Sequence, residues 1–237
     1  ARARTLINFG HELVGSRNGF EGVFKGLTLS LNLENLQGFD LKGKTIGVIG
    51  AGSIGMHVIK IAKGFEMNVL VFNRSKNPKL AKKVGFKYVN FNQLLKNSDI
   101  ITFHVPLTKS TKHVLNSKNV GLIKKGAYLI NTSRGEVIDT TAIIKALDKK
   151  ILAGVGLDVL EEEELIKEES QLLSKKHSRE ELCNIVENHM LLKYDNVIIT
   201  SHNAFNTHEA LERILCETVK NINSVVGKKI DKENLVS

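Results

Sequence analysis

The chain is poor in cysteine, proline and aromatic residues, and it contains no tryptophan. Its 237 residues include two cysteines, Cys183 and Cys216, and two prolines, Pro78 and Pro106. Two cysteines with no CxxC motif and no signal-peptide pattern exclude a small disulfide-stapled secreted protein. We therefore expect reduced thiols and a cytoplasmic protein. Both prolines lie at the ends of predicted elements, so they interrupt no helix or strand.

Long hydrophobic runs are also absent. No apolar stretch approaches the length of a transmembrane helix, so we expect no membrane partner. There is no internal repeat and no low-complexity region. The first residue is not methionine, and residues 1–13 are already helix-like. From this we expect either a trimmed chain or a piece of a longer protein.

Positive charge is in excess, and it is concentrated in the first two thirds of the chain. Residues 1–150 carry 24 Lys and Arg against 9 Asp and Glu, whereas residues 151–237 carry 10 against 16. A basic surplus is common in nucleic-acid-binding proteins. Here the lysines are scattered, no aromatic residues lie among them, and no groove-reading motif is present. We expect a solvated basic face that attracts an anionic cofactor, and no nucleic-acid partner.

Short β-branched runs alternate with amphipathic helical stretches. Strands are predicted at 45–49, 67–72, 100–105, 127–131, 152–157 and 197–200. Helices are predicted at 53–63, 79–84, 91–96, 139–148, 178–190 and 207–226. Because the strands are apolar on both faces, we expect parallel strands that are covered on each side. The fold class is therefore α/β, with a doubly wound parallel sheet of the Rossmann type.

A glycine-rich loop is the most informative motif. The predicted strand 45–49 runs directly into Gly50-Ala51-Gly52-Ser53-Ile54-Gly55, and a helix follows. Gly50 permits the turn, Gly52 lets the backbone approach a pyrophosphate, and Gly55 allows close helix–strand packing. The free N–H groups at the start of the helix then face an anion. The loop predicts a dinucleotide site; the alternative is a glycine turn that only packs.

Three later residues could take part in catalysis or ligand binding, and each follows a predicted strand. Arg134 can hold a carboxylate and polarise an adjacent carbonyl, or it can pair with a nearby acid. Asp158 can accept a hydrogen bond from a carboxamide, or it can be a buried structural acid. His202 is a natural proton donor beside a hydride transfer, and a neighbouring carboxylate would favour its protonated form. The other histidines are expected at the surface or in packing, and the acidic run 161–164 as a solvated helix start.

Together these motifs resemble the D-isomer-specific 2-hydroxyacid dehydrogenase family, in order and spacing, over nearly the whole chain. The residues that carry the resemblance are the glycine loop, His104-Val105-Pro106-Leu107-Thr108, Asn131-Thr132-Ser133-Arg134-Gly135, Gly156-Leu157-Asp158-Val159 and Thr200-Ser201-His202. It implies hydride transfer between a nicotinamide cofactor and a small 2-oxoacid or 2-hydroxyacid. Arg134 would orient the substrate and His202 would be the acid/base. The family's glutamate lies five residues beyond the aspartate, which is Glu163, although the four consecutive glutamates leave this register open.

The resemblance also implies a cofactor site and a homodimer, with no metal ion. The implied cofactor residues are Gly50, Gly52, Ser53, Ile54, Gly55, Asn73, Arg74, Ser75, Val105, Pro106, Thr111, Thr132, Ser133, Arg134, Asp158 and His202. Family members that prefer NAD usually place an aspartate about twenty residues past the glycines, to bind the ribose. This chain has Asn73-Arg74-Ser75-Lys76 instead. The missing acid and the added cations slightly favour NADP(H) over NAD(H).

Family members normally begin with roughly a hundred further residues, which form most of a substrate-binding domain. We therefore divide the chain into a linking helix and connecting arm (1–38), a dinucleotide-binding domain (39–203), and a crossing helix and tail (204–237) that returns to the substrate domain. Asn203-Ala204-Phe205 and the long insertion before it resemble the D-lactate dehydrogenase branch more than the phosphoglycerate branch.

Three hypotheses about function follow. The first is a nicotinamide-dependent reductase of small 2-oxoacids. The second is a non-catalytic dinucleotide-binding regulatory module, like the co-repressor relatives of the family, which resemble the enzymes at these same positions. The third is a truncated family member that binds cofactor and catalyses nothing.

Overall fold

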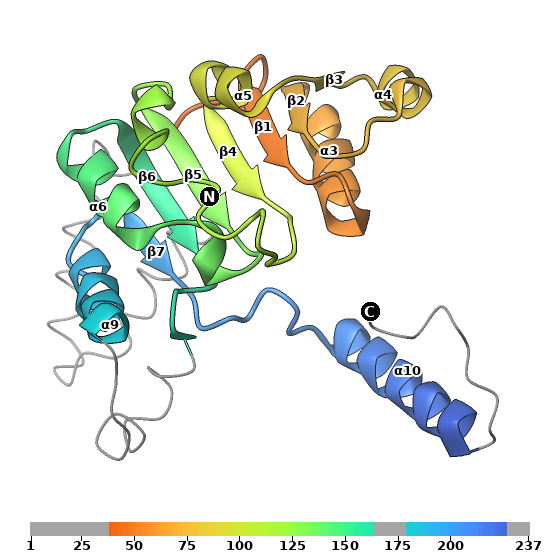
Figure 1. Cartoon of the computed structure of the whole chain (residues 1–237). Coiled ribbons are helices and arrows are strands. Elements are labelled where there is room, and N and C mark those ends of the chain that lie inside the picture. The colour runs from red at the N-terminus through yellow and green to blue at the C-terminus, as the bar shows by residue number, and fades with distance from the viewer. Residues whose placement is uncertain (1–37, 164–178, 227–237) are drawn as a thin grey trace, which may run out of the picture. The chain divides into compact units, whose positions relative to one another are not determined.

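The computed structural model describes residues 38–163 and 179–226 (Figure 1). The chain divides into two compact units, residues 1–42 and 43–237, and every described helix and strand belongs to the second. The predicted linking helix and arm lie outside the described residues except for residue 38. The domain boundaries after residues 38 and 203 stay predictions.

Seven parallel strands form a single sheet in the order β3-β2-β1-β4-β5-β6-β7, and every neighbouring pair is parallel. The strands are β1 (Thr45–Ile49), β2 (Asn68–Phe72), β3 (Lys87–Tyr88), β4 (Ile100–Phe103), β5 (Ala127–Asn131), β6 (Leu152–Leu157) and β7 (Val197–Ile199). The predicted doubly wound sheet is confirmed. Strand β3 was not predicted, because two residues give no periodic signal. The predictions 67–72, 100–105 and 197–200 extend one or two residues beyond the observed strands.

Helices connect the strands, close to the predicted positions. They are α3 (Ser53–Gly64), α4 (Pro78–Val84), α5 (Phe91–Asn97), α6 (Thr140–Asp148), α9 (Arg179–Leu191) and α10 (His208–Val226), with the 3-10 turns η2 (Val120–Leu122) and η3 (Gly135–Val137). Side-chain caps set several of their starts. Asn77 caps α4, whose first residue is Pro78, and Asp139 caps α6. Asn90 and Gln93 form a capping box at α5.

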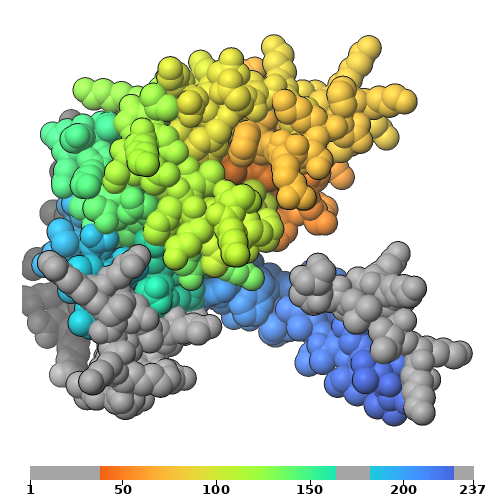
Figure 2. All heavy atoms as spheres, viewed as in Figure 1, coloured from red at the N-terminus to blue at the C-terminus, as the bar shows by residue number. Residues whose placement is uncertain are grey.

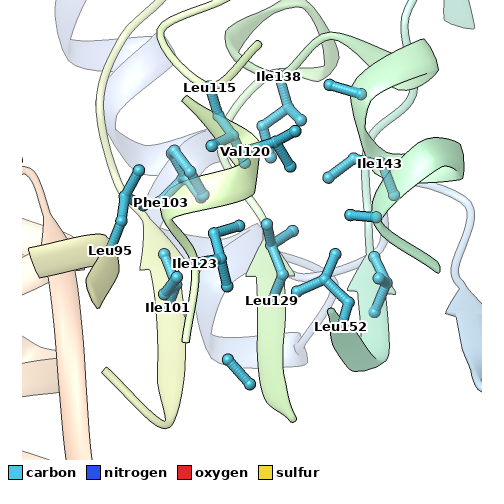
Figure 3. Packing of buried hydrophobic residues seen from close by; sticks show 14 of the residues in the cluster. Leu95, Ile101, Phe103, Leu115, Val120, Ile123, Leu129, Ile138, Ile143 and Leu152 are labelled. Atoms are coloured by element: carbon cyan, nitrogen blue, oxygen red, sulfur yellow. The ribbon is translucent and has the colours of Figure 1, made fainter. Parts of the chain in front are cut away.

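The main hydrophobic core lies between β4, β5 and β6 and the elements η2 and α6. Leu129 is fully buried in it, as are Ile101 and Phe103. Figure 3 shows the strand side chains Ile101, Phe103, Leu129 and Leu152 directed toward the other side of this core. That side is formed by Val120 of η2, Ile123 just after it and Ile143 of α6. This packing fixes the strand ends from which the later half of the site emerges.

Strand β5 departs from the expectation of burial on both faces. Its residues alternate between buried and exposed, and Tyr128 and Ile130 are 36% and 39% exposed. Successive strand side chains point to opposite faces, so one face of β5 is incompletely covered. An apolar sequence run reports hydrophobicity on both faces but does not report what covers them.

Helix α10 has an apolar stripe at helical spacing, as predicted, yet none of its residues is buried. Val219 and Ile222, for example, are 55% and 56% exposed. No helix within residues 38–163 and 179–226 combines the length and apolar character needed to cross a bilayer.

Candidate active site

The carboxyl ends of the strands gather the predicted site residues at one edge of the sheet. The strand order reverses between β1 and β4, and ligands of open α/β sheets bind outside the carboxyl ends at such a point. The glycine loop follows β1, and the other segments follow β2, β4, β5, β6 and β7. Figure 2 shows the segments after β4 and β5 (yellow-green and green) next to each other on one face.

The glycine loop after β1 is tightly packed at two glycines and open at the third. Gly50 has φ +94°, and a Cβ there would overlap the carbonyl of His104. A Cβ on Gly55 would overlap the carbonyl oxygen of Gly50. At Gly52, by contrast, an added Cβ would meet no atom within 4 Å. Packing therefore requires glycine at Gly50 and Gly55, whereas Gly52 faces open space.

The start of α3 fits the pyrophosphate of a dinucleotide. Its N-cap, Gly52, makes no side-chain cap hydrogen bond, and the first turn contains no acidic residue. The N–H groups of this turn and the positive end of the helix dipole therefore favour an anion. An uncapped helix end beside an open glycine is the geometry that such a cofactor needs.

The loop after β2 tethers Asn73 to the glycine loop. Asn73 Oδ1 accepts a hydrogen bond from the Ala51 N–H at 3.2 Å, and its Nδ2 donates to the Ser75 carbonyl at 2.6 Å. Arg74 and Ser75 are exposed. Asn73 thus shapes the loop, and the two residues after it present a cation and a hydroxyl to solvent.

The segment after β4 lies against the glycine loop. A Cβ on Gly50 would overlap both the His104 carbonyl and the Val105 side chain. The Thr111 hydroxyl donates to the Pro106 carbonyl at 2.6 Å and so holds the predicted cofactor residues of this segment in a compact turn. Burial lowers the pKa of His104, whose Nε2 lies 3.0 Å from Thr102 Oγ1.

The turn after β5 carries Arg134. Buried Asn131 organises it, because Oδ1 accepts from the backbone N–H of Ser133 at 3.0 Å and Nδ2 donates to the Arg134 carbonyl at 2.8 Å. Arg134 is exposed, and its Nη1 donates to the Ser133 carbonyl at 2.7 Å. No ion pair of Arg134 is found within the described residues, so the alternative of an arginine paired with a nearby acid has no support there. Thr132 is half-buried in the same turn.

His202 and Glu163 lie side by side. Glu163 Oε2 is 3.3 Å from His202 Nδ1, and the two side chains are 19% and 37% exposed. His202 has φ +49°, and its N–H donates to the Asp158 carbonyl at 2.8 Å. The Phe205 ring meets the imidazole edge-on, with 6.3 Å between ring centroids. The structure therefore brings this predicted pair together, with the imidazole partly open to solvent.

Asp158, after β6, is 2% exposed and anchors the loop that carries His202. Its Oδ1 accepts from Thr200 Oγ1 and from the Asn203 N–H (2.9 Å), and its Oδ2 accepts from the Ala204 N–H (2.9 Å). Burial opposes ionisation, but these hydrogen bonds and the nearby His202 outweigh it, so the pKa of Asp158 lies below the usual aspartate value. Asp158 therefore anchors this loop, and its binding of a cofactor carboxamide stays a prediction.

The expectation of a solvated acidic run is wrong for Glu161, which is 4% exposed. Its Oε1 lies 2.5 Å from His113 Nε2, and its Oε2 accepts hydrogen bonds from the Thr140 N–H and Oγ1. His113, expected as an ordinary surface or packing histidine, is a 33% exposed partner of this acid. No sequence signal links these residues, because they lie 21 to 48 positions apart. Glu164 lies outside the described residues.

Comparison with known families gives one match that spans most of the chain. Residues 25–204 match the model of the NAD binding domain of D-isomer specific 2-hydroxyacid dehydrogenases. This range contains all of the strands and every predicted site residue.

Individual relatives agree with this match. The chain is 43% identical over 185 residues to a glyoxylate reductase from Thermococcus litoralis, an alignment covering 78% of this chain and 50% of that protein. It is 40% identical over 210 residues to 2-hydroxyacid dehydrogenase A from Aspergillus oryzae, covering 87% and 57%. The structure of D-lactate dehydrogenase from Aquifex aeolicus, complexed with NAD and lactic acid, superimposes with a TM-score of 0.77 at 37% identity, covering 96% and 66%. The chain thus spans about half to two thirds of the length of these relatives.

The hydrogen bonds of Asp158 predict a pH-dependent stability. Because the folded state lowers its pKa, the ionised carboxylate stabilises the fold at neutral pH, and this contribution is lost as the pH falls through the folded-state pKa. Asp158→Asn should lower the free energy of unfolding by about 1.5–3 kcal/mol near neutral pH. The difference from wild type should narrow below about pH 4. Urea denaturation followed by circular dichroism from neutral to acidic pH measures it.

Asp195→Asn is the matched control, because Asp195 is exposed. It should change the free energy of unfolding by less than about 0.5 kcal/mol at every pH. A constant difference between Asp158→Asn and wild type down to acidic pH would contradict the assignment.

Proposed function

We propose that this chain, which belongs to the D-isomer specific 2-hydroxyacid dehydrogenase family, supplies the cofactor site and the acid/base group of an enzyme that reduces small 2-oxoacids to D-2-hydroxyacids with NAD(P)H. The observation that carries the proposal is the 3.3 Å contact between His202 and Glu163 at the sheet edge that also bears the glycine loop. A partly exposed imidazole beside a carboxylate can hold a proton and deliver it to a bound carbonyl oxygen.

The residues divide the chemistry among them. The reduced nicotinamide, when bound, supplies the hydride that adds to the carbonyl carbon. His202 gives its proton to the carbonyl oxygen, and the Glu163 carboxylate beside Nδ1 orients the imidazole for this step. Arg134 holds the substrate carboxylate and stabilises the charge that develops on the carbonyl oxygen. In the oxidation direction, His202 takes the proton back.

The relatives support the substrate class. One relative is named a glyoxylate reductase, and another, a D-lactate dehydrogenase, was crystallised with NAD and lactic acid. Glyoxylate and lactate are both small acids that are reduced or oxidised at the 2-position. A homodimer and a cytoplasmic location belong to the same proposal.

The cofactor preference is a finer part of this proposal. The matched domain is an NAD binding domain, and we propose that this chain accepts NADP(H) with a slight preference. The absence of an acid after β2 removes repulsion of a 2′-phosphate, and Arg74 and Ser75 are exposed at that point. Asn73 is held by its bonds to Ala51 and Ser75, and Arg74, next in the chain, is the first charged residue after β2.

Gly52→Val tests the dinucleotide site. The added side chain meets no protein atom within 4 Å at its Cβ, so we expect a folded protein with a branched side chain where the pyrophosphate must approach. Binding of both NADH and NADPH, measured by isothermal titration calorimetry, should be lost. Gly121→Val is the control, because a Cβ there also meets open space. Equal cofactor affinity in the Gly52 variant and wild type would refute the assignment.

Arg74→Asp tests the cofactor preference. The change removes a phosphate partner and adds a like charge, so the affinity for NADPH should fall about tenfold to a hundredfold, while the affinity for NADH changes little. Lys60→Asp makes the same charge change at an exposed position on α3 and should affect both cofactors weakly. A parallel loss of NADH and NADPH affinity in Arg74→Asp would remove it as the discriminating residue.

His202→Gln tests the chemistry in the complete product of the gene that encodes this chain. Reduction of pyruvate or glyoxylate should slow by about 10²–10⁴, the scale of general acid catalysis, with cofactor affinity unchanged. Glu163→Gln should also slow the reduction, because the imidazole loses the carboxylate that lies 3.3 Å from its Nδ1. His208→Gln, at an exposed position, is the control. Full activity in His202→Gln would favour the regulatory or inactive alternatives.

A further inference from the structure

A second buried carboxylate, Glu161, joins three segments that each carry residues of the proposed site. Its Oε2 accepts hydrogen bonds from the Thr140 N–H at 2.8 Å and from Thr140 Oγ1 at 2.6 Å. Its Oε1 lies 2.5 Å from His113 Nε2. The side chain is 4% exposed and both of its oxygens are engaged. A carboxylate in this position binds the protein itself rather than a ligand.

The partners of Glu161 belong to the two neighbouring site segments. His113 lies two residues after Thr111 in the segment that follows β4. Thr140 begins α6, directly after the turn that carries Arg134. The two segments also contact each other, because the His113 N–H donates to the Glu136 carbonyl at 2.8 Å. Glu161 therefore fastens its own turn to both of them.

The backbone at Glu161 is held as firmly as its side chain. The Leu160–Glu161 peptide packs directly on Gly135, where a Cβ would overlap it. Asn188, in α9, donates to the Glu161 carbonyl at 2.8 Å. Glu162 then has φ +53°, so the chain turns sharply immediately before Glu163. With residues 160–162 held in this way, the direction in which the backbone enters Glu163 is set.

We propose that Glu161 is a positioning residue that sets Glu163 beside His202. The proposal rests on the proposed function in one respect, namely that the His202–Glu163 pair is the part of the site that matters for proton transfer. Glu161 supplies no proton and touches no substrate. The titratable groups that face it are His113 and, around the adjoining cavity, Asp139, Cys183 and Glu187. Those near His202 are Glu163 and Asp158.

The test is a double-mutant cycle read at the His202 imidazole in this chain, by the NMR chemical shifts of its ring signals at one fixed pH. Glu163→Gln should shift these signals, because it removes the carboxylate that lies 3.3 Å from Nδ1. In a Glu161→Ala background the same change should shift the signals by less than half as much, because Glu163 no longer stays in place.

Glu187→Ala is the matched control. Glu187 also accepts hydrogen bonds from a threonine of α6, with Thr141 Oγ1 at 2.9 and 3.0 Å from its two oxygens. It lines the same cavity as Glu161, but among the described residues no hydrogen bond joins it to the turn of Glu163. The full shift should persist in this background. It should also persist in Glu161→Gln, whose amide oxygen can still accept from Thr140. A full shift in Glu161→Ala would overturn the proposal, as would no shift in the wild-type background.

If Glu161→Ala does not fold, His113→Ala replaces it. His113 is 33% exposed, and its loss removes one of the two anchors of the carboxylate while leaving Thr140 in place. The Glu163→Gln shift should then be reduced, and a full shift would contradict the proposal. Oxoacid reduction, assayed separately, distinguishes the two levels. If the wild-type protein shows no turnover, the proposed function is wrong and the positioning role of Glu161 is unaffected. If turnover depends on His202 but the effect of Glu163→Gln on the His202 signals is the same with and without Glu161, only the positioning role is wrong.

Discussion

Parallel pairing of all seven strands is the constraint on which the rest of the structure depends. Parallel strands need a crossover after each strand, so every carboxyl end lies at one edge and every return passes over a face of the sheet. The segments after β1, β2, β4, β5, β6 and β7 therefore emerge together, although up to 150 positions separate them. The pairing of the strands is therefore sufficient to bring these loops to the same edge of the sheet, whatever their separation in the sequence.

Buried carboxylates then give these loops their shape. Asp158 accepts three hydrogen bonds from the segment that carries His202, and Glu161 joins the segment after β4 to the start of α6. Removing an ionised group from water is costly unless it is fully hydrogen-bonded. An arrangement that satisfies both oxygens of such a group is therefore strongly preferred over neighbouring loop conformations. In this protein two buried acids, Asp158 and Glu161, follow β6, and each holds a different set of loops at the site.

Much of the architecture could be predicted because it depends on local patterns. The run from Thr45 to Gly55 identifies a strand, a turn and a helix without knowledge of the rest of the chain, and the capped helices begin within a residue or two of their predicted starts. The two-residue strand β3 and the exposed face of β5 could not be predicted. The first is too short to have a period, and the second depends on what covers Tyr128 and Ile130 rather than on their own hydrophobicity.

By itself the sequence determined the sheet, the glycine loop and the membership of the family, because spacing and residue type are sufficient for these. The four glutamates 161–164 show what it leaves open: identical neighbours carry no information about register. Only the tertiary structure decided that Glu161 turns inward to Thr140 and His113 while Glu163 meets His202. The physical reason is the backbone between them, held by Gly135 on one side and turned at Glu162 by a positive φ, which sends two chemically identical side chains into different surroundings.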